Sequence, residues 1–278
     1  MKQLKAFFSI TLLFFLQAIH AQGDTIAPRP QFKLSINYNT RLNYFGRVDS
    51  LKSSGLFPLA ELWLTPDIYV NAAPIFVNNK LQHLDYSGTV ATVGYQHIGT
   101  NWISNVYLTK PFYKESSELV QSALKAQSGI SLAYRNKIVN INVGGDVKLS
   151  DKVDYGASVG LDHVIRIQNK DNSVLVFDPA VYGYAGTQNF QRTYYKKNKS
   201  GLLFFPPGQQ QVTEQVSRFE VLAYEASMPV IYAKGKTMII ATPSYIMPQN
   251  LVENSSSAST SEQGENMFYA TLTVKYSF

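Results

Sequence analysis

The stretch that decides the fold is the end of the chain, which reads Phe268-Tyr269-Ala270-Thr271-Leu272-Thr273-Val274-Lys275-Tyr276-Ser277-Phe278. Apolar residues occupy its even-numbered positions, and the odd-numbered positions after Tyr269 are polar. Successive side chains of a β-strand point to opposite faces, so the pattern predicts a strand with one apolar and one polar face. The segments 31–45, 137–149 and 153–167 repeat this alternation.

Two architectures produce such alternation. One is a water-soluble sandwich or barrel with its apolar face in the core, and the other is a membrane barrel with that face toward lipid. Strands of soluble proteins typically run about 5–6 residues, whereas the alternating segments at the two ends of this chain run 11 to 15. Such lengths suit the ~9–11 tilted residues that cross hydrocarbon. The sequence therefore predicts an all-β fold, a single transmembrane up-and-down antiparallel β-barrel.

The composition of the 278 residues narrows the function classes. Charged residues make up 16% and aromatic residues 13%, which argues against a disordered chain. The absence of cysteine excludes disulfides, Cys-ligated metals, thiol catalysis and a lipid-anchored N-terminal Cys. The net charge of +6 is mild and scattered, so nucleic acid is not an expected partner.

The N-terminus has the three parts of a secretory signal. A basic start with Lys2 and Lys5 precedes the apolar stretch 6–19, and Ala21 supplies the small residue at a cleavage site. We therefore expect a signal peptide over 1–21 and a barrel domain over 22–278. Outside this N-terminus, no apolar run reaches the ~20 residues that a membrane-spanning helix needs.

The spacing of the alternating segments predicts about twelve strands, an even number as in bacterial single-chain barrels. The second hairpin turn falls either after residue 71 or at Pro66-Asp67. Connections 46–56, 111–126, 188–212 and 248–266 are long and polar, whereas those between them are mostly short. This asymmetry predicts long extracellular loops, short periplasmic turns and both termini in the periplasm. The expected strands are 31–45, 57–71, 74–81, 84–97, 100–110, 127–135, 137–149, 153–167, 174–187, 213–232, 237–247 and 267–278.

Two resemblances point to the bacterial outer membrane. Tyr276 and Phe278, after apolar residues at every second position, resemble the C-terminal assembly signal that the barrel assembly machinery recognises, although Ala270 or Thr271 replaces its usual glycine. The mature chain also resembles uncharacterised outer-membrane β-barrels of Bacteroidota type, which implies location and fold but no catalytic residues. The stretches that carry this second resemblance are Tyr44-Phe45-Gly46-Arg47-Val48-Asp49-Ser50, Ala185-Gly186-Thr187-Gln188, Tyr224-Glu225-Ala226-Ser227-Met228-Pro229 and Thr242-Pro243-Ser244-Tyr245 with Pro248.

Aromatic residues near strand ends are expected at the membrane interfaces, where amphipathic rings prefer the headgroup level. Prolines inside strands remove a ladder donor, so we expect bulges at these positions. The aromatic residues are Tyr38, Tyr44, Tyr95, Tyr107, Tyr155, Tyr276 and Phe278, and the prolines are Pro66, Pro179, Pro229 and Pro243.

The sequence offers little chemistry. Barrel hydrolases pair a histidine with a serine two residues further on, but Asp85, Gly99 and Ile165 follow the three mature histidines at that spacing. There is no His-Glu-x-x-His motif and no EF-hand-like loop. We therefore expect no catalytic residues, no cofactor and no metal site, and hence not an enzyme.

The polar faces of the strands predict which residues line the lumen. Both signs of charge occur there in comparable numbers, so neither a cation nor an anion preference follows. The loop 188–212 could fold inward as a plug or project as a binding surface. The expected lumen-lining residues are Lys33, Asn37, Arg41, Asp154, Asp162, Arg166, Arg218, Glu220 and Lys275.

The function that these patterns favour is a passive pore or transporter for small solutes in the outer membrane, without chemistry of its own. One alternative is a closed structural barrel, or one that binds a surface partner through its long loops. Another is a barrel enzyme that acts on outer-membrane lipid. The expected partners are outer-membrane lipid and lipopolysaccharide, the barrel assembly machinery and a small solute.

Overall fold

The computed structural model describes residues 30–49, 51–81, 83–114, 117, 119, 123–189, 218–251 and 264–278. The predicted signal peptide and most of the loop 188–212 lie outside these residues. Within them, no helix is long and apolar enough to cross a bilayer. The strands are β1 (Gln31–Asn39), β2 (Asn43–Tyr44), β3 (Arg47–Val48), β4 (Ser54–Trp63), β5 (Ile68–Asn78), β6 (Asp85–Ile98), β7 (Trp102–Tyr113), β8 (Ala126–Tyr134), β9 (Asn140–Leu149), β10 (Val153–Asp162), β11 (Ile165–Gln168), β12 (Val174–Phe177), β13 (Ala180–Gly186), β14 (Glu220–Ser227), β15 (Val230–Lys234), β16 (Thr237–Pro248) and β17 (Met267–Ser277).

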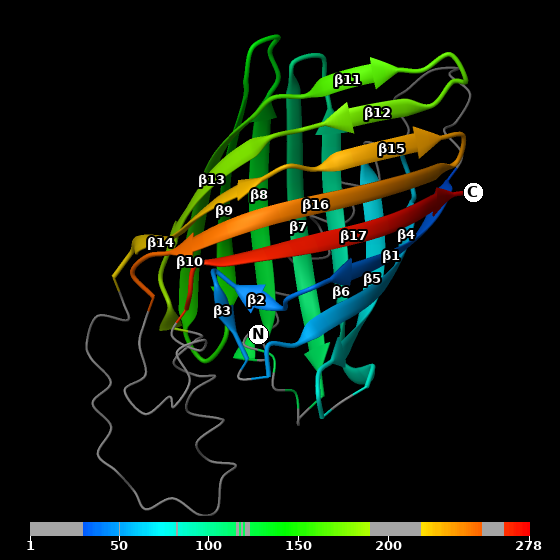
Figure 1. Cartoon of the computed structure of the whole chain (residues 1–278). Helices are drawn as coiled ribbons and strands as arrows, with labels where there is room; N and C mark the ends of the chain where they lie inside the picture. Colours follow the sequence, from blue (N-terminus) through cyan, green and yellow to red (C-terminus); the bar gives the residue numbers. More distant parts are fainter. Residues whose placement is uncertain are drawn as a thin grey trace, which may run out of the picture.

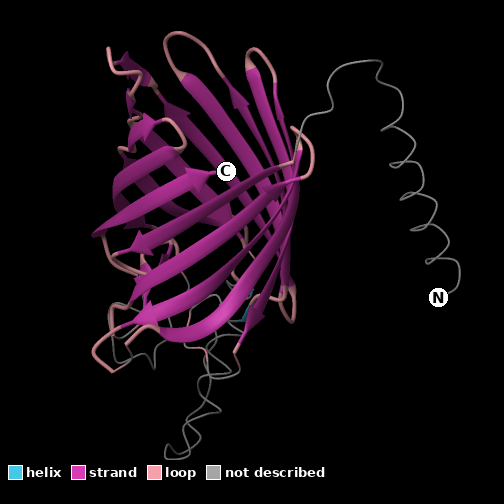
Figure 2. Cartoon of the chain, turned by 90° about the vertical axis from the view of Figure 1, so that its right-hand side faces the viewer, coloured by secondary structure: helices cyan, strands magenta, loops and turns pink. Residues whose placement is uncertain are grey.

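The strands close into one antiparallel barrel (Figures 1 and 2). β17 pairs with β1 on one side and with β16 on the other, which joins the two ends of the chain and removes the open edge. Around the ring of described strands the order is β1, β4 to β10, β13, β14, β16 and β17, which makes twelve. The predicted fold class is confirmed.

Three of the long ribbons are interrupted at neighbouring places. Short breaks separate β10 from β11, β12 from β13 and β14 from β15. Pro179 and Pro229 lie in two of these breaks, where their carbonyl oxygens accept hydrogen bonds from His163 N at 3.1 Å and Asp178 N at 3.0 Å. The pairing keeps one register across the breaks, with Ala180 opposite Ser227 and Phe177 opposite Val230, so the bulges expected at these two prolines are not formed. The prolines instead interrupt the ladders without inserting a residue, in a row of bends across the barrel wall.

The other two prolines differ from each other. Pro243 lies within β16 opposite Ala270 in an unbroken register, so the bulge expected there is not formed either. Its carbonyl oxygen accepts a hydrogen bond from Met228 N at 3.0 Å, beside the break between β14 and β15, so it continues the row of bends. Pro66 instead lies in the hairpin turn between β4 and β5. The turn therefore sits at Pro66-Asp67, the second of the two predicted placements.

The two faces of the barrel wall differ as the alternation predicts. Outward side chains are mostly apolar and exposed, as in β1, where Ile36 is 56% exposed while Ser35 is only 7% exposed. Since the ring is closed, the exposed apolar parity is the outer face and the half-buried parity looks into the barrel. Among the exposed apolar side chains of the outer face are Phe32, Leu34, Val106, Leu108, Phe112, Val159, Leu272 and Val274.

The two ends of the barrel carry different connections. We call the end with connections 40–53, 79–84, 114–125, 150–152, 187–219 and 249–266 the loop end, and the end with 64–67, 99–101, 135–139, 169–173 and 235–236 the turn end. Both Gln31 and Phe278 lie at the turn end, where Phe278 N donates to Phe32 O at 2.9 Å. The C-terminus in Figure 1 marks this end.

Some strand boundaries differ from the prediction. The first strand ends at Asn39 rather than at residue 45, because the chain turns inward at Thr40 and Arg41. In the described part of the tenth predicted strand, pairing begins only at Glu220. Both differences fall at the loop end. There the loop residues still alternate between apolar and polar types, so the sequence predicts a longer strand, but their backbones no longer pair with a neighbouring strand.

Candidate functional site

The barrel interior is the candidate site, because polar side chains from distant strands converge there. Near the turn end, Glu61 Oε1 accepts hydrogen bonds from Trp63 Nε1 at 2.8 Å and from Lys275 Nζ at 3.1 Å. Lys33 Nζ lies 3.8 Å from the same oxygen and 4.6 Å from the centroid of a Trp63 ring. We call Lys33, Glu61 and Lys275 the lysine–glutamate cluster. Since two ammonium groups share one carboxylate, the cluster presents net positive charge to the interior.

A second carboxylate is held nearer the loop end. Tyr269 donates its hydroxyl to Glu225 Oε1 at 2.7 Å, and Tyr184 donates to Glu225 Oε2 at 3.2 Å. The ring of Tyr182 stacks on that of Tyr184, with centroids 6.1 Å apart. Because both carboxylate oxygens are bonded, Glu225 is held in place within a tyrosine-rich wall formed by β13, β14 and β17.

The connection 40–53 folds into the barrel instead of projecting from it. In it, β2 and β3 pair as a short hairpin over residues 43–48, which we call the inner hairpin. Val48 is fully buried in a cluster with Ala223, Ile246 and Met267 from β14, β16 and β17. The inner hairpin therefore packs on one wall of the barrel at its loop end.

A glycine lets the inner hairpin approach that wall. Gly46 has a φ of +85°, and a Cβ added there would lie 2.3 Å from the Pro248 ring, so both the backbone conformation and the space favour glycine. Gly46 O accepts a hydrogen bond from Glu265 N at 3.1 Å. Glu265 also accepts one from Lys52 Nζ at 2.7 Å. These contacts tie the inner hairpin to the last loop of the chain.

The other side of the inner hairpin faces β9 and β10. Burial, and then the carboxylates of Asp146 and Asp154, raises the pKa of the Tyr44 hydroxyl well above its usual value, while Arg47 opposes this shift. Tyr44 thus lies within electrostatic reach of all three charges. Asp154 also accepts hydrogen bonds from Thr187 Oγ1 and from Asn189 N, each at 2.6 Å. The inner hairpin therefore reaches from β16 and β17 toward β9 and β10, and it narrows the barrel at the loop end.

Elsewhere the wall is lined by tyrosines that lie flat on glycines. A Cβ added at Gly94 would meet the Tyr69 ring at 2.3 Å, at Gly129 the Tyr107 ring at 2.6 Å, and at Gly160 the Tyr182 ring at 2.2 Å. Each ring therefore rests on the bare backbone of the neighbouring strand rather than filling the interior.

Space remains in front of part of this wall. Ser131, on the inner face of β8, is exposed. An exposed side chain on that face means that the interior beside β8 is accessible to water, in contrast to the wall on which the inner hairpin packs.

An apolar groove follows the row of bends on the outer face, lined in part by Leu161, Val181, Tyr245 and Phe268. His163 also lines this groove, yet no described hydrogen bond joins it to a serine hydroxyl.

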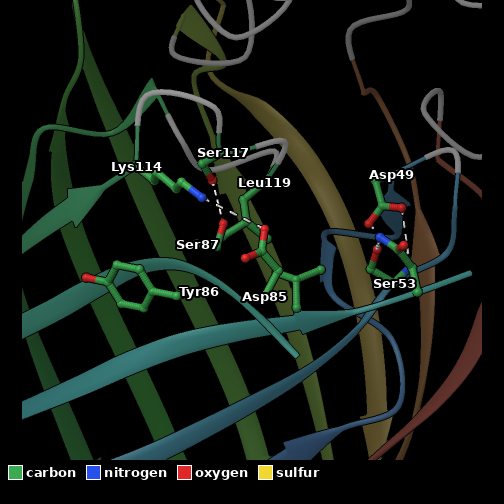
Figure 3. A pocket seen from close by; sticks show the side chains of 10 residues that line it. Asp49, Ser53, Asp85, Tyr86, Ser87, Lys114, Ser117 and Leu119 are labelled. Carbon is green, nitrogen blue, oxygen red and sulfur yellow. Dashed lines mark hydrogen bonds and ion pairs between the residues drawn. The ribbon is translucent and has the colours of Figure 1, made fainter. Parts of the chain in front are cut away.

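A small polar pocket lies at the loop end between β5, β6 and the residues Lys114, Ser117 and Leu119 (Figure 3). Several of its polar groups are hydrogen-bonded: Ser87 Oγ and Ser117 Oγ are 2.7 Å apart, and Asp49 Oδ1 accepts a hydrogen bond from the backbone N of Leu51 at 2.9 Å. Lys114 lies 4.0 Å from Asp85. Across the residues that the structure describes, no three His, Cys, Asp or Glu side chains gather as metal ligands.

The structure brings five of the predicted lumen residues to the inner face of β1, β10 and β17. Lys33 and Lys275 belong to the lysine–glutamate cluster. Asn37 donates to Phe57 O at 3.0 Å and accepts a hydrogen bond from Thr273 Oγ1 at 2.7 Å. Asp154 lies near the loop end. The fifth, Asp162, accepts hydrogen bonds from two asparagines of β9, Asn140 and Asn142.

The other four predicted residues lie apart from these. Arg41 follows the end of β1 and donates to the carbonyl oxygens of Thr40 and Lys52, at 3.3 and 3.2 Å. Arg166 pairs with Val176 and shares its face, but it is exposed on β11 at the turn end. Arg218 is exposed just before β14, and Glu220 is that strand's half-buried first residue. That all nine line an open pathway stays a prediction.

Sequence reasoning missed several inward residues. Glu61 could not be assigned to a face because the position of the second turn was ambiguous. Lys148 lies on the polar parity of its strand and pairs with Asp146, but it was not included among the predicted lumen residues. Tyr44 and Tyr107 were expected at the membrane interfaces, but Tyr44 is buried in the inner hairpin and Tyr107 rests on Gly129 inside the barrel. Strand parity could have assigned Tyr107, whereas the inward fold of residue 44 leaves no local signal.

Comparisons with solved structures find outer-membrane β-barrels. The chain is similar to the KdgM porin, with a TM-score of 0.49, 7% identity and coverage of 88% of this chain and 99% of that one. It is similar to LpxR from Salmonella typhimurium (TM-score 0.45, 10% identity, 88% and 99% covered). It is also similar to an outer membrane channel from Pseudomonas putida F1 (TM-score 0.43, 13% identity, 92% and 99% covered). No family model and no curated protein matches the chain.

Proposed function

We propose that this protein is an outer-membrane channel through which small solutes pass passively. The observation that carries the proposal is the division of the closed wall into an apolar outer face and a polar inner face. A barrel in a membrane must satisfy its backbone groups within the ring, and it can place water only inside. The exposed inner face near Ser131 supports a water-filled path beside β8.

The orientation follows from the two ends of the barrel. Both Gln31 and Phe278 lie at the turn end, which we place in the periplasm because the short turns of bacterial outer-membrane barrels face that side. In this proposal the chain reaches the periplasm by export through the signal peptide, with cleavage after Ala21. The loop end then faces the outside, as the longer connections of outer-membrane barrels do. The outer face meets the acyl chains of outer-membrane lipid and lipopolysaccharide.

The inner hairpin sets the width of the path in this proposal. It crosses part of the loop end, so the free path runs between the inner hairpin and the tyrosine–glycine wall. The fixed carboxylate of Glu225 and the net positive lysine–glutamate cluster lie on the same inner face at different depths. A solute therefore meets both signs of charge in succession rather than a uniform field.

The test is single-channel recording on refolded mature protein in planar lipid bilayers. We expect discrete open-state currents that disappear when the protein is denatured before reconstitution. Replacing residues 43–48 by a glycine–serine linker of equal length is expected to raise the conductance, because the inner hairpin no longer fills the loop end. Silence from folded, inserted protein, with or without residues 43–48, would contradict a channel and favour a closed barrel.

A further inference from the structure

Three neighbouring strand segments depart from the alternation that governs the rest of the barrel. Strands that read as continuous apolar runs are normally covered by apolar groups on both faces. Here the outer face is proposed to meet lipid, whereas the inner face borders the interior of the barrel and leaves these apolar side chains available to a bound molecule. The segments, from β12, β15 and β16, read Val174-Leu175-Val176-Phe177, Val230-Ile231-Tyr232-Ala233 and Met238-Ile239-Ile240-Ala241.

The inward residues of these segments form one surface at the turn end. The strand registers place Val176 beside Ile231 and Ile231 beside Ile240. The side chains of this surface are half-buried, so they remain accessible from the interior. We call the surface the apolar patch; it consists of Val174, Val176, Ile231, Ala233, Met238 and Ile240.

Positive charge borders the apolar patch on two sides. Met238 of β16 lies opposite Lys275 of β17, so the apolar patch continues directly into the lysine–glutamate cluster. On the far side, Val176 lies opposite Arg166 of β11, whose side chain is exposed. At the first border Glu61 already serves both Lys33 and Lys275. Toward the loop end, Asp178 follows Val176 by two residues and lies beside Asp162 of β10, so the cations are confined to the two lateral borders. Apolar surface between two such cationic borders complements a molecule with an apolar body and an anionic head.

We infer that the apolar patch, together with Lys275 and Arg166, binds small amphiphilic anions, namely carboxylates that carry an apolar chain or ring. The apolar part covers the inward valine, isoleucine and methionine side chains, and the carboxylate lies against a cation at the border. This inference rests on the proposed channel function, because it names the class of solute that the channel admits. Three strands about 4.8 Å apart make the apolar patch roughly 10 Å wide, which suits a chain of medium length.

The experiment uses the mature chain in lipid nanodiscs, since detergent would itself occupy the apolar patch. Binding of carbon-13-labelled decanoate is measured by NMR against empty nanodiscs, which correct for partition into lipid. We expect saturable binding of decanoate. Acetate, which lacks the chain, and decyltrimethylammonium, which has the opposite charge, are each expected to bind at least about tenfold more weakly.

Matched variants assign the site. Ile231→Thr combined with Ile240→Thr is expected to weaken decanoate binding at least about tenfold, whereas Ile103→Thr, on the inner face of β7 at the same end, leaves it unchanged. Lys275→Gln is expected to weaken decanoate but not decyltrimethylammonium. Lys110→Gln, which removes the same charge from the outer face of β7, is the control for charge alone.

The outcomes separate this inference from the channel function. Unsaturable decanoate uptake, equal affinity for the two decyl compounds, or binding that survives the double isoleucine variant would each overturn the binding site. If the same preparation conducts ions but binds no decanoate, the channel stands and the site fails. If it binds decanoate at the apolar patch but carries no current, the site stands and the channel fails.

Discussion

A tyrosine on one strand and a glycine on the next form the smallest repeated unit of this wall. The Tyr69 ring lies over Gly94, where even a methyl group would come within 2.3 Å of it. The Tyr69 hydroxyl then reaches Asn105 Oδ1 at 3.1 Å, two strands away. One missing Cβ therefore allows a large aromatic residue to line the interior without closing it.

The first prediction tests this unit. Gly94→Ala is expected to lower the free energy of unfolding by about 1–3 kcal/mol, because the new methyl group overlaps a packed ring. The measurement is a urea titration in lipid vesicles, followed by tryptophan fluorescence and by the heat-modifiable gel mobility of the folded barrel.

Two controls accompany it. Gly145→Ala places a methyl group on the outer face, where the nearest atom would be 3.7 Å away, so little change is expected. In a Tyr69→Ala background the cost of Gly94→Ala should largely vanish, since the overlapping ring is gone. If Gly94→Ala still lowers the free energy of unfolding in that background, the glycine is required by its backbone conformation and not by contact with the Tyr69 ring.

At the scale of elements, two segments determine the width of the interior and the closure of the wall: the inner hairpin and the closing strand β17. The inner hairpin is held by Val48 in its buried cluster, by the close approach of Gly46 to Pro248 and by the Lys52–Glu265 ion pair. β17 is held by full ladders to β1 and β16. The first element narrows the path, and the second closes the wall.

The second prediction concerns the inner hairpin. Gly46→Val places a β-branched residue at positive φ and against the Pro248 ring, so it is expected to undock the inner hairpin while the barrel stays closed. Single-channel records should then show larger and noisier currents than wild type. Conductance and noise equal to wild type would show that the inner hairpin does not bound the path.

The third prediction concerns the end of β17. Phe278→Asp is expected to leave the protein exported but poorly inserted, because the terminal aromatic resembles the signal read by the assembly machinery. The Phe278 ring also packs 5.4 Å from that of Phe32, centroid to centroid, across the seam. The readout is resistance to extraction together with heat-modifiable mobility in outer-membrane fractions. Extraction resistance and heat-modifiable mobility at wild-type levels would contradict an assembly role for Phe278.

At the scale of the whole molecule, the question is which face of the wall meets lipid. Leu108 and Thr109 are neighbours in the middle of β7 and point to opposite faces. Leu108 is 52% exposed on the outer face, whereas Thr109 contacts Thr92 inside the barrel through a 2.9 Å hydroxyl hydrogen bond.

The fourth prediction uses this pair. Leu108→Arg is expected to destabilise the protein in vesicles by about 2–4 kcal/mol, the cost of a lipid-facing arginine near the bilayer midplane. Thr109→Arg should cost less, since its charge reaches water inside, and it should change ion selectivity instead. The unfolding free energy and the reversal potential measure the two effects. If the two arginines destabilise equally, the outer face is not in lipid.

Much of the architecture was predictable because alternation is a local property. The face of each side chain can be assigned from its neighbours in the sequence alone, without the partner strand, as for Phe32 and Lys33 or for Val274 and Lys275. The candidate site was only partly predictable. Lys33 and Lys275 were identified as inward, but their shared carboxylate, Glu61, depends on the register between β1 and β4 and on the position of a turn. Arg41 was placed on a strand that ends two residues earlier, because a loop can keep the alternation after pairing stops.

The sequence by itself determined the long two-faced strands, their number, and the apolar parity that faces outward, since each depends on residues at most two positions apart. Only the tertiary structure decided that the connection 40–53 turns inward, that tyrosines lie on glycines, and that apolar segments of β12, β15 and β16 meet between Lys275 and Arg166. The physical reason is that these features arise from registers between strands and from the space inside a closed ring. The strand registers and the interior space are defined only once the last strand has paired with the first.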